Sequence, residues 1–153
     1  MHLSTSRVAS VLFTALFLLN AGTVSVNGAD PIAIAHRGLL RHAPENTLPA
    51  FAVCLELGMG FELDIRTTKD GHLVVLHDDS VKRTTDGPAR SVRDMTLAEI
   101  QQLDAGTWFG QSFAGLTVPT LEETLSLVKE RKCGVTIIAL NVKQLNRDGE
   151  AKL

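Results

Sequence analysis

The sequence predicts an α/β fold with a parallel β-sheet, and three observations support this prediction. Apolar segments typical of strands, at residues 32–35, 61–67 and 135–142, alternate with segments of helical spacing at 48–55 and 121–131. Polar, chemically active side chains directly follow the first of these strands and occupy alternate positions of the second. Alternating strands and helices place the helices over the faces of a parallel sheet, so an α/β architecture is expected.

The first strand, at residues 32–35, is almost entirely apolar, as expected for a strand buried on both faces. It ends at His36-Arg37-Gly38. After a loop, Asn46 can cap a helix in which apolar residues recur at helical spacing over 48–55. Gly58 is expected to end that helix.

The second strand, residues 61–67, alternates between apolar and polar positions. The apolar positions are Phe61, Leu63 and Ile65, and the polar positions are Glu62, Asp64 and Arg66. Side chains two positions apart on a strand project from the same face. The carboxylates of Glu62 and Asp64 are therefore expected to point together.

The remainder of the chain predicts a short strand, a polar insertion, a helix and a final strand. The short strand covers residues 72–76, after a turn signal at 69–71, and ends at His77-Asp78. The insertion covers 79–118, and a capping box at Thr96 and Glu99 opens a short helix within it. A second capping box, at Thr120 and Glu123, opens the helix that ends near Arg131, and the last strand follows at 135–142.

Residues 1–28 have the character of a secretory signal peptide, which leaves residues 29–153 as the mature domain. The apolar run Val8 to Leu19 is 12 residues long, whereas a membrane span needs about 20. Small residues follow it, as cleavage requires. We therefore expect a secreted or periplasmic protein without a stable membrane span, and an uncleaved N-terminal anchor is the alternative.

The charge of the chain argues against nucleic acid as a partner, and its two cysteines allow two interpretations. Arg7 is the only basic residue in the first 28, so 14 basic residues remain against 17 acidic ones, and no basic stripe is present. Nucleic acid is therefore not expected as a partner, because phosphate backbones require clustered positive charge. Cys54 and Cys133 are interpreted as two separate buried thiols, although export would permit a disulfide.

Two histidines, an arginine and a carboxylate pair are the groups needed to cleave a phosphate ester with a divalent metal. Glu62 and Asp64 can hold the metal, and the planar fork of Arg37 matches phosphate oxygens. Of His36 and His77, one must remove the nucleophile's proton and the other must protonate the leaving alkoxide. We take His36 as the base and His77 as the acid, and the reverse assignment stays open.

The chain resembles the glycerophosphodiester phosphodiesterase family over residues 34–143, through many separate blocks in the family's order. These blocks are His36-Arg37-Gly38, Pro44-Glu45-Asn46-Thr47, Phe51, Glu62-x-Asp64, Thr68-x-Asp70-Gly71, His77-Asp78, Arg83-Thr84-Thr85 and Pro119-Thr120-Leu121-Glu122-Glu123. The Glu45 in the second block is either an active-site neighbour or a helix N-terminal charge.

The resemblance implies a TIM barrel with a small insertion after the second strand, and metal-dependent hydrolysis of glycerophosphodiesters to sn-glycerol 3-phosphate and an alcohol. The metal would be Mg²⁺ or Ca²⁺, and the substrate a small molecule. By the resemblance, His36 and His77 are the acid and base, Arg37 holds the phosphate, and Glu62 and Asp64 hold the metal. The sequence leaves the alcohol and the oligomeric state open.

One departure from the family concerns the last strand. The family has a glutamate, one residue and then a lysine there, and the glutamate is a metal ligand. This chain reads Asn141-Val142-Lys143. Asn141 offers a carbonyl oxygen without charge, so metal affinity is expected to fall, while Lys143 matches and is expected to face the substrate phosphate.

The second departure is length, because a TIM barrel typically needs about 250 residues. We expect the chain to hold about the first three βα units and the insertion, as the N-terminal part of a longer protein or as a truncated product. Two alternatives to the main hypothesis follow. One is a sphingomyelinase D-like lipid phosphodiesterase, which shares the two histidines and the Glu-x-Asp pair, and the other is an inactive remnant.

Overall fold

The computed structural model describes residues 33–131 and 137–151. Its strands are β1 (Ile34–Ala35), β2 (Gly60–Thr67), β3 (Leu73–Val75) and β4 (Ile138–Gln144). Its α-helices are α1 (Leu48–Glu56), α2 (Leu97–Ile100), α3 (Leu121–Arg131) and α4 (Arg147–Glu150), and the 3-10 turns are η1 (Val81–Arg83), η2 (Val92–Asp94) and η3 (Gln111–Phe113). The predicted signal peptide and Cys133 lie outside the described residues.

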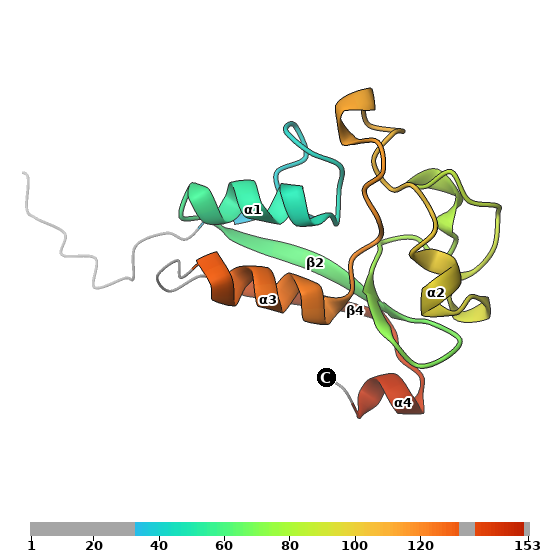
Figure 1. The fold of residues 1–153 in the computed structure, drawn as a ribbon. Helices are drawn as coiled ribbons and strands as arrows, with labels where there is room; N and C mark the ends of the chain where they lie inside the picture. The colour runs from blue at the N-terminus through green and yellow to red at the C-terminus, as the bar shows by residue number, and fades with distance from the viewer. Residues whose placement is uncertain (1–32, 132–136, 152–153) are drawn as a thin grey trace, which may run out of the picture. The chain divides into compact units, whose positions relative to one another are not determined.

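The strand β2 is the centre of the sheet, because every other described strand pairs with it (Figure 1). β1 pairs in parallel with its start and β4 pairs in parallel along most of its length. β3 instead pairs antiparallel with its end. The parallel prediction is thus confirmed for β1, β2 and β4. The direction of β3 was not predicted, and it is antiparallel because the turn around Gly71 is too short for a crossover connection.

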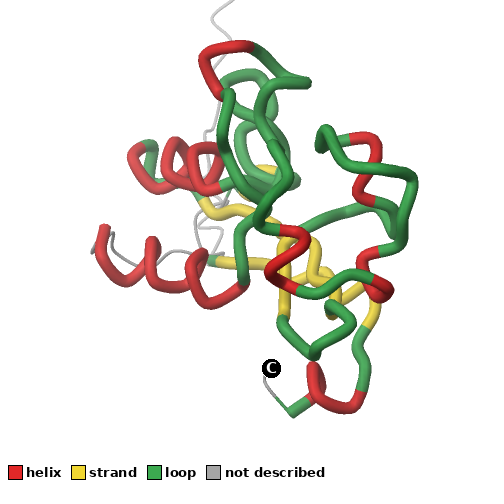
Figure 2. The backbone as a smooth tube through the Cα atoms, turned by 45° about the vertical axis from the view of Figure 1, so that its right-hand side comes forward, coloured by secondary structure: helices red, strands yellow, loops and turns green. Residues whose placement is uncertain are grey.

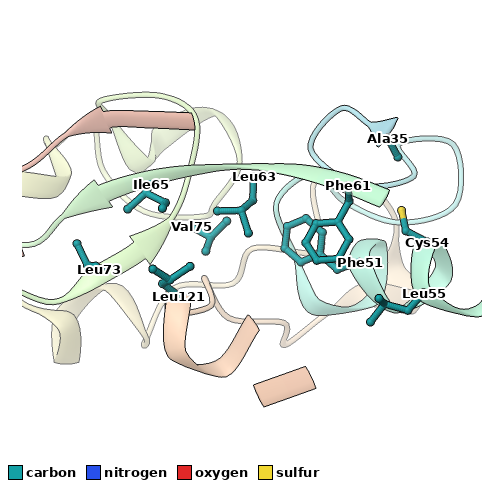
Figure 3. Close-up of a cluster of buried hydrophobic side chains, with 10 residues drawn as sticks. All are labelled: Ala35, Phe51, Cys54, Leu55, Phe61, Leu63, Ile65, Leu73, Val75 and Leu121. Atoms are coloured by element: carbon teal, nitrogen blue, oxygen red, sulfur yellow. The ribbon is translucent and has the colours of Figure 1, made fainter. Parts of the chain in front are cut away.

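The apolar side chains of β2 form a core with α1 and α3 on one face of the sheet (Figure 3). Leu63 and Ile65 are fully buried there, and Leu121 at the start of α3 packs against the same cluster. Phe51 of α1 stacks on Phe61 with ring centroids 4.4 Å apart. The alternation predicted for β2 is confirmed, and it leaves the opposite face of the sheet for polar residues.

The two predicted capping boxes are present, whereas Asn46 does not cap α1. Thr96 and Glu99 exchange hydrogen bonds at the start of α2, and Thr120 and Glu123 do so at the start of α3. The N-cap of α1 is Thr47, whose side chain makes no capping hydrogen bond. The side chain of Asn46 is used elsewhere, as described below.

The segment between β3 and α3 is an insertion made mostly of loops and turns (Figure 2). It has a separate small core, in which Val81, Val92 and Ile100 are fully buried or nearly so. Its two ends lie together, because Val74 and Thr120 form an antiparallel bridge and the Val75 N–H donates to Pro119 O (2.8 Å). The insertion therefore has its own core and is closed at its two ends. A further attachment lies at the turn between β2 and β3, where the Lys69 N–H donates to Met95 O (2.8 Å).

Two further predictions concern Cys54 and a membrane span. Cys54 is buried in α1, its thiol donates to Ala50 O, and burial raises the pKa of the thiol. Its predicted burial is confirmed, and the expectation for Cys133 is untested. Among the residues the structure describes, no helix has the length and apolar character needed to cross a bilayer.

Gly38 is required where the chain turns from β1 towards α1. Its φ is +84°, a conformation that side-chain-bearing residues rarely adopt. A Cβ there would lie 2.7 Å from the Cβ of Ala50. The glycine after His36-Arg37 therefore lets the loop pass directly over α1.

Replacing Phe51 with alanine should lower the free energy of unfolding by about 3–5 kcal/mol, because a buried ring is lost and a cavity remains. Urea denaturation of the purified chain measures the change. Leu57→Ala is the control, since Leu57 is 60% exposed just after the same helix and should cost less than about 0.5 kcal/mol. Equal effects of the two substitutions would contradict this account of the core.

Candidate active site

Glu62 and Asp64 project from the polar face of β2, opposite the helices. The side chain of Asp64 is fully buried and that of Glu62 is 13% exposed. Both lie within β2, because this strand continues to Thr67 to pair with β3. The predicted convergence of the two carboxylates on one face is confirmed, although they lie inside the strand rather than at its end.

Arg37 contacts both carboxylates from the loop after β1. Its backbone N–H donates to Glu62 Oε2 (3.0 Å), and its Nε lies 3.5 Å from Asp64 Oδ2. Its Nη1 donates to Glu45 Oε1 (3.1 Å). The φ of Arg37 is +58°, which is strained for a residue with a long side chain. These contacts hold the strained conformation in place.

The buried carboxylate of Asp64 is bound by residues from two other segments. Asn46 donates from Nδ2 to Asp64 Oδ2 (2.9 Å), and its Oδ1 accepts from the Asp64 backbone N–H (3.2 Å). Asn46 also has a positive φ, +56°, which asparagine tolerates well. Lys143 of β4 places its Nζ 3.3 Å from Asp64 Oδ1. Asn46 is thus a site residue that the sequence led us to interpret as a helix cap.

A register shift in β4 accompanies the approach of Lys143. Asn141 pairs with Asp64 and Val142 with Ile65, but the next partner of β2 is Gln144, so Lys143 is an extra residue in a β-bulge. Bulges redirect side chains and are common beside active sites. The register also places Asn141 on the neighbouring strand beside Asp64.

His36 immediately follows β1 and is the more exposed of the two candidate catalytic histidines. Its side chain is 64% exposed, and its Nε2 lies 4.0 Å from Glu62 Oε2. His42 and His72 are exposed as well. Only His36 of these three has a described contact with the carboxylate pair.

His77 follows β3 and is held on both its ring and its backbone. Its Nδ1 lies 2.8 Å from Asp78 Oδ1, and its carbonyl accepts from Nε and Nη2 of Arg66. A carboxylate can only accept hydrogen bonds, so Nδ1 is assigned as the protonated nitrogen and Nε2 is left for proton transfer. Asp78 therefore selects one tautomer of the imidazole.

Arg83 of η1 joins Asp78 to Glu45. It donates to both carboxylate oxygens of Asp78 (2.6 and 3.0 Å) and to both of Glu45 (2.7 and 2.9 Å). Burial raises the pKa of Glu45, but Arg83 and then Arg37 outweigh it and hold that pKa below its ordinary value. Hydrogen bonds from Arg83, followed in effect by those from His77, hold the pKa of Asp78 well below its ordinary value despite partial burial.

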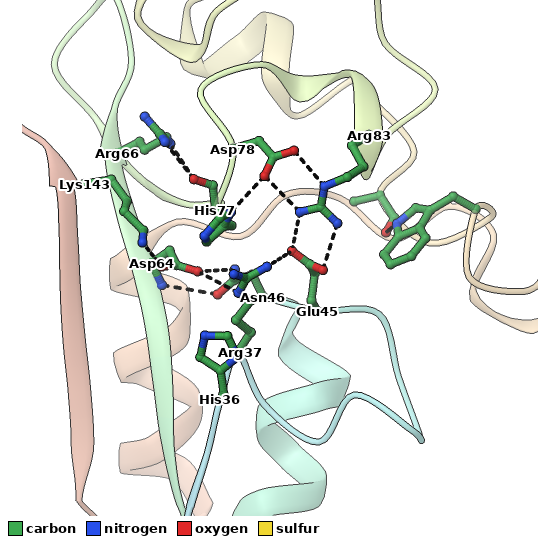
Figure 4. Close-up of polar contacts among 12 residues, drawn as sticks. His36, Arg37, Glu45, Asn46, Asp64, Arg66, His77, Asp78, Arg83 and Lys143 are labelled. Carbon is green, nitrogen blue, oxygen red and sulfur yellow. Dashed lines mark hydrogen bonds and ion pairs between the residues drawn. The ribbon is translucent and has the colours of Figure 1, made fainter.

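Figure 4 shows these side chains gathered in one region from four separate segments of the chain. The labelled residues are His36, Arg37, Glu45, Asn46, Asp64, Arg66, His77, Asp78, Arg83 and Lys143. The structure therefore brings together the predicted residues of the loops after β1 and β3 and those of β2 and β4. It adds Asn46, Asp78 and Arg83, and it resolves Glu45 as a neighbour of the site.

The two carboxylates retain oxygens suited to a hard cation. Glu62 Oε1 and Asp64 Oδ1 are buried and accept no hydrogen bond, the ammonium of Lys143 being near Asp64 Oδ1 without hydrogen-bond geometry. Buried anionic oxygens without donors are costly unless another charge meets them. No cluster of three or more His, Cys, Asp or Glu ligands occurs in the described residues. The oxygen ligands available to a cation are thus those of Glu62 and Asp64, and Asn141 can add a neutral oxygen.

Sequence comparisons show that the chain is similar to phosphodiesterases. A sequence model of the glycerophosphoryl diester phosphodiesterase family matches residues 36–152. The chain is 51% identical over 107 residues to a glycerophosphodiester phosphodiesterase of Caldanaerobacter subterraneus, covering 69% of the chain and 44% of that protein. It is 39% identical over 138 residues to a glycerophosphodiester phosphodiesterase of Bacillus subtilis, covering 78% and 47%. The chain spans less than half the length of these curated relatives.

Solved structures show the same likeness in three dimensions. A glycerophosphodiester phosphodiesterase from Agrobacterium tumefaciens superposes with a TM-score of 0.71 at 37% identity, covering 80% of this chain and 51% of that one. A phosphodiesterase from Oleispira antarctica, in complex with the product sn-glycerol-3-phosphate, gives 0.68 at 38% identity, covering 74% and 44%. These neighbours are TIM-barrel proteins, so the predicted partial barrel is confirmed.

Asp78→Asn should make the protein's stability less dependent on pH in the acid range. The pKa of Asp78 is lower in the folded protein than in the unfolded chain, so the unfolded chain binds the proton first as pH falls below about 4. This contribution to stability is complete above that pH and is lost progressively below it. The free energy of unfolding, measured by urea denaturation from about pH 6 to pH 2.5, should fall less steeply in the variant.

The control for this experiment is Asp94→Asn, which removes an exposed carboxylate from η2 in the same insertion. It corrects for the general effect of losing one surface acid. Parallel curves for wild type and Asp78→Asn through the acid range would contradict the ion-pair network described here.

Proposed function

The chain belongs to the glycerophosphoryl diester phosphodiesterase family, and on that premise we propose that it carries the catalytic site of a hydrolase that converts glycerophosphodiesters to sn-glycerol 3-phosphate and an alcohol. The observation that carries the proposal is the site's combination of two carboxylates that have unsatisfied oxygens with Arg37 beside them, and with His36 and His77 in the loops after β1 and β3. The Oleispira relative's complex with sn-glycerol-3-phosphate supports this product.

Arg37 is proposed to bind the substrate phosphate. Its Nη1 donates to Glu45, and its Nε lies 3.5 Å from Asp64 Oδ2 without a hydrogen bond. Its Nη2 has no hydrogen-bond partner in the part of the chain that the structure describes. That free end of the fork can donate to a phosphate oxygen. Lys143 lies on the other side of Asp64 and can add a second positive charge towards the same phosphate.

His36 and His77 are proposed to move the protons. His36 would accept the proton of the attacking water as the new P–O bond forms. His77 would act as the acid in its doubly protonated form, keeping the Nδ1 proton on Asp78 and donating the Nε2 proton to the alkoxide as the ester P–O bond breaks. The contact of His77 Nδ1 with Asp78 supports its role, because it aims Nε2 away from the carboxylate. The exposed position of His36 leaves it accessible to water.

Glu62, Asp64 and Asn141 are the residues that would hold a divalent cation, Mg²⁺ or Ca²⁺. When bound, such an ion neutralises phosphate charge and polarises the ester for attack. Hard cations favour anionic oxygens, so a set with one neutral amide should bind more weakly than one with three carboxylates. The proposed enzyme therefore has a weaker metal site than the family pattern implies.

The activity test is release of sn-glycerol 3-phosphate from glycerophosphocholine. We expect activity with added Mg²⁺ or Ca²⁺, loss of activity with a chelator, and a fall of about 10²- to 10⁴-fold in His36→Ala. His42→Ala is the matched control, because His42 is exposed in the loop after His36. Turnover of sphingomyelin instead of glycerophosphocholine would favour the lipid phosphodiesterase alternative, and no turnover of either would favour the inactive remnant.

Asn141→Glu should raise the affinity for Mg²⁺ or Ca²⁺ by on the order of tenfold or more, because it restores an anionic ligand beside Asp64. Calorimetric titration of the metal measures the change without requiring turnover. Gln144→Glu is the control, because it adds the same charge on β4 opposite Arg66 rather than Asp64. An unchanged dissociation constant in Asn141→Glu would refute Asn141 as a ligand position.

We further propose that the protein is exported, to the periplasm or outside the cell, by a signal peptide at residues 1–28, leaving 29–153 as the mature segment. The composition of that segment supports this proposal. N-terminal sequencing of the protein from its source cells would test it, and a retained Met1 would overturn it.

A further inference from the structure

Arg83 is the residue through which the insertion reaches the candidate active site. It is the last residue of η1, and η1 is fixed to the insertion's core by the fully buried Val81. Thr85 secures the turn further, since its hydroxyl donates to Val81 O (2.8 Å) and accepts from Gly87 N–H (3.0 Å). The backbone that carries Arg83 is therefore held by structure that lies outside the sheet.

The guanidinium of Arg83 is shared between two carboxylates from different loops. Its Nε and Nη2 pair with Asp78, and its Nη1 and Nη2 pair with Glu45. All three nitrogens are thus engaged by side chains, and both acids are bound through both oxygens (Figure 4). Arg83 is consequently occupied as a bridge rather than left open to an anionic substrate.

Each of the two carboxylates also binds a residue of the proposed machinery. Asp78 Oδ1 meets Nδ1 of His77, and Glu45 Oε1 meets Nη1 of Arg37. An unbroken chain of polar contacts therefore runs from the proposed acid, through Arg83, to the proposed phosphate ligand. We propose that Arg83 is a positioning residue, which fixes the tautomer and orientation of His77 through Asp78 and the fork of Arg37 through Glu45.

The chemistry of this bridge requires arginine. A planar guanidinium can bind two carboxylates bidentately at once, whereas an ammonium is a single point charge. Without the bridge, Asp78 and Glu45 would be neighbouring acids that share no cation. Asp78 would then be free to rotate away from His77 Nδ1. The insertion, which the sequence presents as a polar addition, thus supplies a part of the reaction geometry.

The insertion also contains a matched control. Arg90 pairs with Glu99 (2.9 Å) and with a backbone carbonyl of the insertion, and both ion-pair side chains are at least 40% exposed. It makes no described contact with any residue of the candidate site. Arg90→Met therefore removes an insertion arginine without breaking the bridge.

The experiment compares wild type, Arg83→Met, Arg83→Lys and Arg90→Met as full chains. Proteins labelled with ¹⁵N-histidine give long-range ¹H–¹⁵N spectra that report the tautomer of His77, with its signals identified by their loss in His77→Gln. Circular dichroism and thermal melting confirm that each variant is folded. Kinetics on glycerophosphocholine then give kcat and KM separately.

We expect wild type and Arg90→Met to show His77 protonated at Nδ1. Arg83→Met should show a mixture of tautomers, and Arg83→Lys should remain folded but recover only part of the Nδ1-protonated form. Where turnover is measurable, kcat should fall about tenfold or more in Arg83→Met with a smaller change in KM. A His77 tautomer in folded Arg83→Met and Arg83→Lys identical to that of wild type would overturn the proposal.

The inference rests on the proposed function for its kinetic readout alone. The spectroscopic result does not need turnover, so the proposal about Arg83 and the proposed function can fail separately. Altered His77 spectra in a protein without phosphodiesterase activity would support the bridge and count against the function. Full activity with an unaltered tautomer in Arg83→Lys would support the function and overturn the bridge.

Discussion

The burial of Asp64 in the middle of β2 is the constraint on which the rest of the site depends. A fully buried carboxylate costs several kcal/mol unless hydrogen bonds and opposite charges meet it. Here they come from three directions: Asn46 after β1, Arg37 in the same loop, and Lys143 on β4. Each of these residues reaches Asp64 from an unusual backbone feature, namely a positive φ at Asn46 and Arg37 and a bulge at Lys143.

The two faces of β2 have different roles: one contributes to the core and the other carries residues of the candidate site. The face towards α1 and α3 contributes apolar burial, including the stacked pair Phe51 and Phe61, which stabilises the sheet. The other face concentrates charges that oppose stability and that the core must support. Strained or destabilised groups at functional sites persist in proteins because the surrounding structure fixes them.

The features that could be predicted from the sequence are those encoded by local spacing or by short motifs. The alternation along β2, the capping boxes of α2 and α3, and the candidate residues from His36 to Lys143 all follow from spacing or motif. Asn46 could not be assigned correctly, because its local preference for a helix cap competes with a buried carboxylate 18 residues away. The direction of β3 was predictable in principle from the short turn at Gly71. The partners of Arg83 were not, because they depend on how the insertion packs, although the residue itself lies in a recognised block.

The adjacent ends of the insertion have an evolutionary consequence. Because Val74 is bridged to Thr120, the closure of this segment is already fixed by the sheet, and the entropy of closing a longer segment grows only slowly with its length. Segments attached in this way can lengthen, shorten or be exchanged between proteins while the underlying barrel keeps its register. The part nearest β3, as far as η1, is tied to the site through Arg83, and the stretch from η2 to α2 is tied to the turn between β2 and β3 through Met95 and Leu97. The stretch around η3 is therefore the part that can vary. Homologues should therefore differ most in size at this stretch.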